Sequence, residues 1–487
     1  MGTVHQFPVQ DKPAAGEPAE AFARALRIAV DAKVGAVASF QEREVAALAL
    51  SNEATRLFLR DDLVAIADRH GEEVEVDGRI YKRHEPGTVK YFTLCGALDL
   101  ERWTYREVGV WNGPTIVPME LEAGLVEGTT PALGFRIALG YAKDHMRSCE
   151  EDMTADHRCP PSRSTLERTA KAIGTEVKQV AHRIEPRLRQ AERVPDEAVA
   201  IALGLDRTAV PMEEARPSGA VPTTRRKPRR TPYARKPPDP VTVNFRMAYV
   251  GTVSFYDAEG QELGTRSYAA AAHESPTDCV VSRMMADVRN ALRQAPTLTV
   301  GVIQDGAPEM WNLLRSPLAA EPRVTTYYEA IDRYHLNERL GKILLCTEPE
   351  AARRTARLSQ WNESLDHNDY AIYRIRESIR TAYADAITQH DFTLRDQLDP
   401  HLTYLENNAY LMKYARLREA GLPVGSGVTE GGCKSVIQKR TNSSGQRWRP
   451  EGLEAVLSLR AVYMSERLPR FWAHFARAYR KEVTRCA

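Results

Sequence analysis

The sequence of 487 residues has no run of about 18 consecutive apolar residues, the length that a membrane-spanning helix needs. Its first residues, MGTVHQFPVQDKPAAGEPAE, contain no basic segment followed by an apolar run, so they do not predict a secretory signal. These two absences exclude the common classes of membrane and secreted protein. We therefore expect a cytoplasmic protein with no membrane partner.

Cysteine is scarce and has no pairing pattern. The sequence has seven cysteines, an odd number, and none belongs to a CxxC pair, which argues against a disulfide framework and a cysteine-rich zinc site. We expect a reducing compartment in which most of these cysteines are small buried residues. The formal net charge of +2 says little about partners, but Arg and Lys cluster locally.

Hydrophobic periodicity divides the chain into helical and β-rich stretches. Apolar residues at three-to-four spacing predict helices over residues 16–69 and again over 121–148. Between them, short alternating segments over 74–108 predict a small antiparallel sheet with a hairpin at Asp77-Gly78. Residues 336–420 are almost entirely helical in pattern and rich in charge. A chain of this length is expected to hold about two to four domains.

A helix pair is predicted where the segment SRSTLERTAKAIGTEV begins. Ser164 is a candidate helix cap, because Glu167 follows three residues later. Gly174 then separates two helical patterns, which is the arrangement of a helix-turn-helix. This short pattern fits a DNA-binding element and a plain helical hairpin equally well, so both interpretations stay open.

Three acidic residues stand where secondary structure is predicted to begin or end. The apolar runs AVAIALGL and TLTVGVIQ predict buried strands that end in Asp206 and Asp305. After a Gly-rich lead-in, helical spacing places Glu430 in the first turn of a helix. Neighbouring strand ends meet at one edge of a sheet, and a helix packed on that sheet can bring its first turn there. The sequence therefore allows the three carboxylates to converge.

Converging carboxylates imply a cation, because like charges repel each other unless a positive ion joins them. Mg²⁺ and Mn²⁺ prefer such oxygen ligands. Two ions about 3.5–4 Å apart would activate a water molecule and stabilise the leaving oxygen of a phosphodiester. The alternative is that each acid only caps a helix or stabilises a turn.

Cations gather in two places. Residues 213–240 are rich in Pro, Arg and Lys and nearly free of large aliphatic residues, which is typical of a flexible arm. The arm is either a solvated loop or a set of DNA phosphate contacts made by Arg225, Arg226, Lys227, Arg229 and Arg230. The stretch after Glu430 adds candidate DNA contacts, including a Trp that would stack on a base or cover a helix junction. These are Lys434, Lys439, Arg440, Arg447 and Trp448.

Several segments together resemble a known family. In chain order they are GLDRTAVPM, GTVSFYDAEG, VIQDGAPEMWNLL, IDRYHLNERL and LPVGSGVTEGGCKSVIQKRTNSSGQRW, which span roughly residues 195–465. They resemble the DDE transposases of bacterial insertion sequences, of the ISKra-type group. The last segment is long and specific, and the first is short. Asp332 to His335 also matches the Asp/Cys-x-x-His signature of several transposase groups.

The resemblance implies an α/β fold, with a ribonuclease H-like mixed sheet, flanking helices and an all-α insertion before the final acid. It implies that Asp206, Asp305 and Glu430 hold two Mg²⁺ or Mn²⁺ ions. His335 is either a support of this active site or a histidine of the core or of a helix cap, and both interpretations stay open. The implied function is metal-dependent cleavage at the ends of a mobile element and strand transfer into target DNA, by a homodimer associated with the bacterial nucleoid. A ribonuclease H-like nuclease without strand transfer and a catalytically inactive, domesticated DNA-binding protein are the alternatives.

Five segments describe the predicted organisation. They are an N-terminal helical and small β region (1–120), a helical, helix-turn-helix-like region (121–195), the first part of the catalytic core (196–345), the helical insertion (346–420) and the last part of the core with the C-terminal helices (421–487). The first segment departs from the family, because the CxxC pairs that often precede the small sheet are reduced here to Cys95. A structural zinc is therefore not implied.

Neutralising the five cations of the arm, Arg225, Arg226, Lys227, Arg229 and Arg230, should weaken DNA binding with little regard to sequence. The logarithmic salt slope should flatten by roughly 0.9 for each phosphate that the variant no longer neutralises. Discrimination between terminal and random DNA should change little, because phosphate contacts carry no direct base information. Filter binding over a salt series measures both quantities, and an unchanged slope would identify the arm as a solvated loop.

Overall fold

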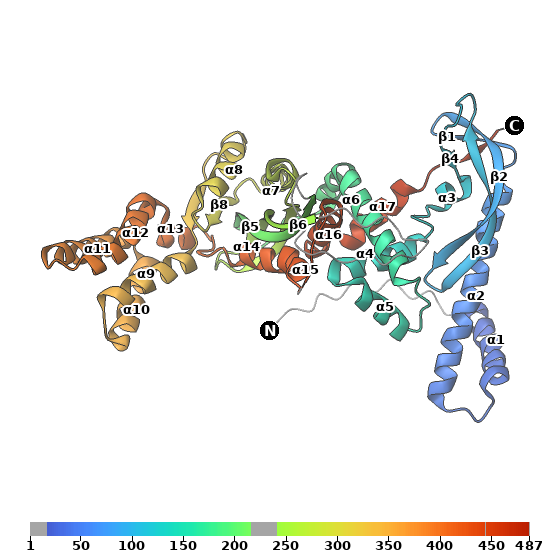
Figure 1. Cartoon of the computed structure of the whole chain (residues 1–487), viewed down its shortest axis with the longest axis horizontal. Coiled ribbons are helices and arrows are strands. Elements are labelled where there is room, and N and C mark those ends of the chain that lie inside the picture. The colour runs from blue at the N-terminus through green and yellow to red at the C-terminus, as the bar shows by residue number, and fades with distance from the viewer. Residues whose placement is uncertain (1–16, 216–240, 444, 487) are drawn as a thin grey trace, which may run out of the picture. The chain divides into compact units, whose positions relative to one another are not determined.

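The computed structural model describes residues 17–215, 241–443 and 445–486 (Figure 1). The described chain is a mixed α/β protein with two five-stranded sheets, which confirms the predicted fold class. It divides into two compact units, Met1–Ile173 with Ala473–Ala487 and Gly174–Trp472. None of the helices in these described ranges combines the length and the apolar content that a membrane crossing needs.

The first unit joins helices to an antiparallel sheet. Ser39 caps α2 through a capping box, in which its side chain accepts from the Glu42 amide at 3.3 Å and Glu42 accepts from the Ser39 amide at 2.8 Å. The strand order is β10-β1-β2-β3-β4, and the predicted Asp77-Gly78 hairpin joins β1 to β2 with both residues at positive φ. The elements are α1 (Glu17–Val34), α2 (Phe40–Asp68), β1 (Glu73–Val76), β2 (Arg79–Thr93), β3 (Gly96–Glu107), β4 (Thr115–Ile116), α3 (Pro118–Ala123), α4 (Pro131–Lys143), α5 (Met146–Ala155) and β10 (Thr484–Arg485).

Helix α6 (Arg163–Ala191) is continuous, so the predicted helix-turn-helix around Gly174 is wrong. Gly174 lies inside this helix and faces α16 (Pro450–Met464). A Cβ atom at Gly174 would lie 2.5 Å from the carbonyl oxygen of Ala455 and 2.7 Å from its Cβ. The glycine therefore permits a close approach of two helices rather than a turn, a role that a single sequence does not reveal.

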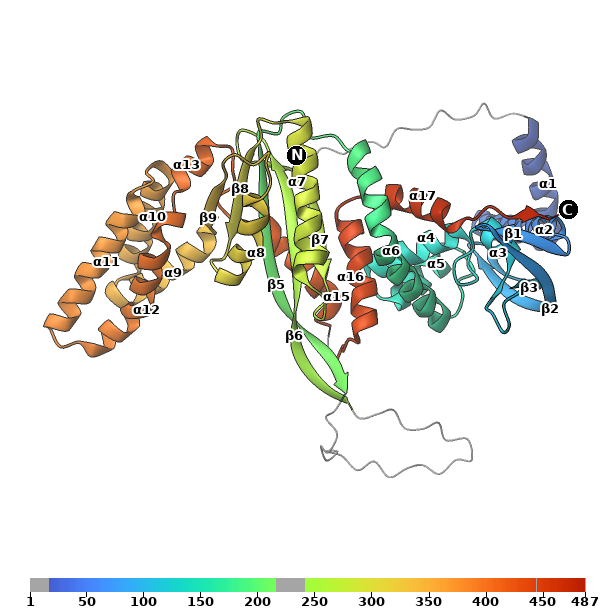
Figure 2. The same cartoon turned by 90° about the horizontal axis from the view of Figure 1, so that it is seen from above.

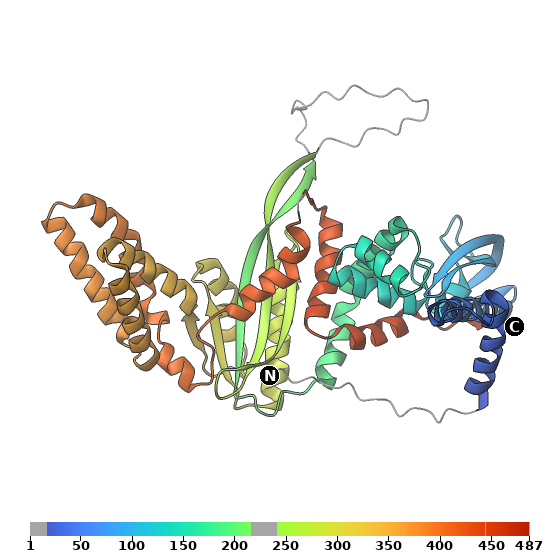
Figure 3. The ribbon, with the colours of Figure 1, turned by 90° about the horizontal axis from the view of Figure 1, so that it is seen from below.

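The second unit is built on a mixed sheet in the order β7-β6-β5-β8-β9. Its first two pairings are antiparallel, and β8 is parallel to both β5 and β9. Figure 2 shows α7 and α8 over one face of this sheet, and Figure 3 shows α14 and α15 over the other. The elements are β5 (Ala200–Ala215), β6 (Val241–Tyr256), β7 (Glu262–Ala270), η1 (Thr277–Val281), α7 (Ser282–Gln294), β8 (Thr299–Gln304), α8 (Pro308–Ala319), β9 (Tyr328–Ile331), α14 (Gly427–Gly432), η3 (Cys433–Gln438) and α15 (Lys439–Thr441). Helix α17 (Leu468–Tyr479) begins in this unit and ends in the first.

Strands β5 and β6 extend well beyond their neighbours, as Figure 3 shows. The pairing of β5 with β8 stops at Leu203, whereas its pairing with β6 continues to Ala215. Asp206 therefore does not end its strand, and this prediction is wrong. It lies just beyond the last residue of β5 that pairs with β8. The strand persists because β6 alone supplies the hydrogen bonds of the two-stranded ribbon. The predicted arm cations from Arg225 to Arg230 lie outside the described residues.

Between β9 and α14 the described chain contains helices and short connections but no strand. This confirms the prediction of an all-helical segment over residues 346–420. Its first helix begins at Arg333, directly after β9, so the segment leaves the sheet beside the predicted site. The elements are α9 (Arg333–Thr347), α10 (Ala351–His367), α11 (Ala371–Thr388), α12 (Phe392–Asn408), η2 (Ala409–Leu411) and α13 (Tyr414–Glu419).

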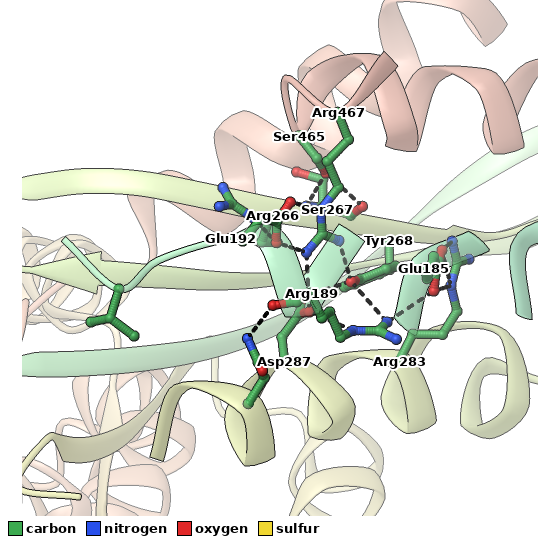
Figure 4. A network of polar contacts seen from close by, with 12 residues as sticks. Glu185, Arg189, Glu192, Arg266, Ser267, Tyr268, Arg283, Asp287, Ser465 and Arg467 are labelled. Atoms are coloured by element: carbon green, nitrogen blue, oxygen red, sulfur yellow. Dashed lines mark hydrogen bonds and ion pairs between the residues drawn. The ribbon is translucent and has the colours of Figure 1, made fainter. Parts of the chain in front are cut away.

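A buried network of ion pairs ties α6 to the sheet of the second unit (Figure 4). Asp287 of α7 accepts hydrogen bonds from Arg189 at 2.7 Å, from Tyr268 at 2.6 Å and from Arg467 at 3.1 Å. Burial raises the pKa of Asp287, but Arg467 and Arg189 outweigh it and hold that pKa below its ordinary value. The carboxylate is therefore charged and fully paired, and loss of one arginine would leave a buried charge.

Substitution of Gly174 by Ala should destabilise the protein, whereas the same change at Gly341 should not. The added methyl at Gly174 meets the α16 backbone, and such overpacking costs about 1–3 kcal/mol. At Gly341, in α9, a Cβ meets nothing within 4 Å, so the higher helix propensity of Ala should stabilise by about 0.5–1 kcal/mol. Thermal unfolding of the two variants measures the opposite signs, and equal shifts would contradict the close approach of the helices.

Candidate active site

The structure brings Asp206, Asp305, His335 and Glu430 together around one cleft of about 250 Å³. Asp206 comes from β5, Asp305 directly follows β8, His335 lies in the first turn of α9 and Glu430 in the first turn of α14. The order of the sheet explains this convergence, because β5, β8 and β9 are adjacent and parallel where they are paired. Asp305 is exposed, while the other three are half-buried.

A strand and a helical segment meet along one side of the cleft. Alternate residues of β5 point to one face of the sheet, and residues 204, 206 and 208 each meet the segment 427–441. A Cβ atom at Gly204 would overlap the Thr429 hydroxyl at 1.9 Å, so only glycine permits this approach. Next along the strand, the Cys433 thiol bonds to Asp206, and Gln438 Nε2 then donates to Thr208 Oγ1 at 3.0 Å.

The helical segment contains a π-helical turn, η3, beside Asp206. Such turns interrupt the regular α-helical hydrogen bonds and are frequent at functional sites. Arg460 of α16, only 2% exposed, donates from Nε to the carbonyl oxygen of Val436 at 2.9 Å and from Nη2 to that of Ser435. The buried guanidinium thus satisfies carbonyl groups within the turn and fixes its shape.

The Asp206 carboxylate is destabilised in its charged form. Burial raises the pKa of Asp206 above its ordinary value, and the nearby charges of Asp305 and Glu430 raise it further. Hydrogen bonds from the Arg207 amide, at 2.7 Å, and from Cys433 partly offset this effect. Burial also raises the pKa of the Cys433 thiol, which therefore stays protonated and donates to Asp206. The cleft is a place where added positive charge would be stabilised.

Glu430 and Asp305 are both held by neighbouring groups. The Glu430 Oε1 atom lies 3.3 Å from His335 Nε2 and 3.3 Å from the Ser426 hydroxyl oxygen. Asp305 Oδ1 accepts from the amide of Ala307 at 2.9 Å, just before α8 begins at Pro308. Each of the three carboxylates therefore has a donor of the protein already beside it.

Asp332 holds the starts of two helices in place. It is 1% exposed, and its Oδ1 caps α9 by accepting from the amides of Tyr334 at 2.5 Å and His335 at 3.1 Å. Its Oδ2 accepts from both the amide and, at 2.5 Å, the hydroxyl of Ser426, the residue that precedes α14. This one buried carboxylate therefore fixes the position of His335 relative to Glu430.

The donor chemistry of the cleft fits a hard divalent cation, since three carboxylates line it and two of them raise the pKa of Asp206. As the side chains lie, however, the described residues contain no group of three or more His, Cys, Asp or Glu side chains arranged around one ion. Asp206 points instead to Cys433, and Glu430 points to Ser426 and His335. Asp305 points to the Ala307 amide. Binding of an ion would require them to turn from these donors.

The predicted DNA contacts divide into exposed and buried residues. Lys434 lines the cleft, and it is exposed together with Lys439 and Arg447. Arg440 and Trp448 are only 2% and 7% exposed, so the predicted DNA contact is wrong for these two. The backbone amide of Trp448 donates to the carbonyl oxygen of Pro211 in β5 at 2.9 Å, so the chain pairs with the β5 ribbon at this point.

Sequence reasoning missed Ser426 and Cys433 as parts of the site. Both are buried and line the cleft, where Ser426 contacts Glu430 and Cys433 donates to Asp206. Their spacing contained a signal, because residues four before and three after Glu430 share its helical face. The sequence alone indicates Cys433 only as a small buried residue, and Asp332 only as part of a resembling motif.

No known protein family matches the sequence, and a search of curated proteins finds none that is similar to it.

Replacing Asp332 by Asn should destabilise the protein far more than replacing Asp391, which caps α12 from the surface through one bond to the Leu394 amide at 3.0 Å. At Asp332, the Asn amide would face the Ser426 amide donor and lose a buried charge-assisted bond, worth about 1.5–3 kcal/mol. Asn and Asp are nearly equal caps, so Asp391→Asn should change stability by less than about 0.5 kcal/mol. Calorimetry compares the two, and equal losses would refute the bridging role.

Proposed function

We propose that this protein is a DDE-type DNA transposase that cuts DNA at the ends of a mobile element and joins the resulting 3′-hydroxyl groups to target DNA. One observation carries the proposal: Asp206, Asp305 and Glu430, far apart in the sequence, line one cleft with His335. Carboxylates in this arrangement suit metal-assisted reactions at phosphodiesters. The resemblance of the surrounding motifs supports transposition over other reactions of that class.

The cofactor that fits this donor set is Mg²⁺ or Mn²⁺, with two ions expected. When bound, the ions would activate a water or hydroxyl nucleophile and stabilise the leaving oxygen. Asp206, Asp305 and Glu430 would hold them. The raised pKa of Asp206 supports this, since a cation would relieve the repulsion from Asp305 and Glu430.

The other residues of the cleft have supporting roles in this proposal. His335 would orient Glu430 through the contact at 3.3 Å and is close enough to the cleft to meet a scissile phosphate. Lys434 lines the cleft, where its ammonium would offset phosphate charge. The exposed Lys439 and Arg447 extend the basic surface, on which DNA would bind. A homodimer is proposed because two element ends must be brought together.

Substitution of Asp305 by Asn should abolish divalent-metal-dependent cleavage of element-end DNA. It should leave DNA affinity largely intact, because Asp305 is exposed at the cleft and is not part of the core. Saturating Mg²⁺ or Mn²⁺ should raise the melting temperature of the wild type but not of this variant, since a ligand stabilises only the state that binds it. Asp396→Asn, at an exposed site on α12, is the matched control.

An assay with a labelled element end and a second duplex separates the alternatives. Joining of the cut end to the second duplex supports the transposase. Metal-dependent cleavage without joining would instead indicate a nuclease. DNA binding with no cleavage and no metal-induced thermal shift would indicate an inactive DNA-binding protein and would overturn the proposal.

A further inference from the structure

A second hollow in the same unit combines aromatic rings with cations. It has a volume of about 420 Å³ and lies where β9 begins, and it shares no lining residue with the carboxylate cleft. Tyr328 reaches it from the first position of β9 and Tyr327 from the residue before that strand, while Tyr410 and Lys413 come from the end of the helical segment. We call it the tyrosine hollow.

One wall of the tyrosine hollow is held rigid by an ion pair. Arg315 of α8 donates to both oxygens of Glu329 at 2.7 Å, and its guanidinium lies 5.3 Å from the ring centre of Trp311. Arg315 also bonds to the Tyr410 hydroxyl, which fixes the position of that ring. Glu329 is therefore neutralised by its partner and does not repel an anion.

Three cations line the tyrosine hollow, and two of them are paired, Arg315 with Glu329 and Arg416 with Asp369 at 3.1 Å, which leaves Lys413 for a ligand. Within the described ranges, Lys413 forms no ion pair with a carboxylate, and it lines the tyrosine hollow beside Tyr410. Tyr410 is 54% exposed although it is a large aromatic residue. An exposed ring next to a free ammonium matches the two parts of a nucleotide, because bases stack on aromatic rings and phosphates bind cations.

We propose that the tyrosine hollow binds a nucleotide of single-stranded DNA, with its base on Tyr410 and its phosphate on Lys413. The choice of DNA rests on the proposed function. The strand must be single, because a base inside a duplex cannot stack on a side chain without first leaving the helix. Since Tyr410 and Lys413 belong to the helical segment, this segment would bind substrate as well as connect β9 to Glu430.

Alanine substitution of Tyr410 tests the stacking contact. In EDTA, Tyr410→Ala should weaken the binding of a fluorescent single-stranded oligonucleotide at least about fivefold, the lower end of measured base-stacking effects. Tyr410→Phe, which keeps the ring, should stay within about twofold of the wild type. Tyr370→Ala is the matched control, because Tyr370 is 66% exposed on the same helical segment but does not line the tyrosine hollow.

Lys413→Gln tests the phosphate contact, and should flatten the logarithmic salt slope for single strands by about 0.7. Equal affinities of the wild type and Tyr410→Ala would overturn the proposal. The proposal would also be overturned if Tyr410→Ala lost as much affinity for inorganic polyphosphate as for the oligonucleotide. Polyphosphate has no bases to stack, so this result would indicate a general anion site.

Photo-crosslinking of the unaltered protein provides a measurement that does not depend on variant folding. An oligonucleotide containing 5-iodouracil should crosslink to peptides that contain Tyr410, Tyr327 or Tyr328, and crosslinks confined to other peptides would overturn the proposal. The result is separable from the proposed function because binding is measured without metal. Cleavage by a protein whose Tyr410→Ala variant binds normally would refute only the tyrosine hollow, whereas stacking without cleavage would refute only the transposase.

Discussion

The close approach of the segment 427–441 to strand β5 is the constraint on which the candidate site depends. It exists because Gly204 has no side chain where the Thr429 hydroxyl lies. Once these two residues are in contact, the next positions follow in register, so that Asp206 meets Cys433 and Thr208 meets Gln438. A larger residue at position 204 would move Glu430 away from the sheet and open the cleft.

The remaining acid of the site, Asp305, and the buried Asp332 beside the site are both positioned by the end of the sheet. Asp305 directly follows β8, and Asp332 follows β9 one strand further along. Because Asp332 bonds to both Ser426 and the first turn of α9, it connects the edge of the sheet to the helix that carries Glu430. The cleft is thus built from backbone positions that packing determines. The fold holds its carboxylates together against their mutual repulsion.

The sequence predicted the parts of this arrangement whose signals are local. The apolar run that ends in Asp305 located that residue, and helical spacing located Glu430, while charge and periodicity indicated the helical segment. Prediction from the sequence failed where the local structure depends on a contact with residues that are distant in the chain. The local pattern indicates a turn at Gly174, because nothing nearby in the sequence shows Ala455 against it. It places Asp206 at a strand end because the continuous apolar run stops at Leu205, although β5 continues by pairing with β6. The burial of Arg440 and Trp448 depends on their tertiary surroundings.

The proposed function requires that Asp206, Asp305 and Glu430 form one binding site for divalent metal. Anomalous diffraction from crystals grown with Mn²⁺ would locate such ions without relying on activity. We expect anomalous peaks in the cleft, about 2.0–2.3 Å from carboxylate oxygens that have turned away from Cys433, Ser426 and the Ala307 amide. Absence of any peak there, with the three carboxylates still bonded to those donors at saturating Mn²⁺, would contradict the metal site and the chemistry that rests on it.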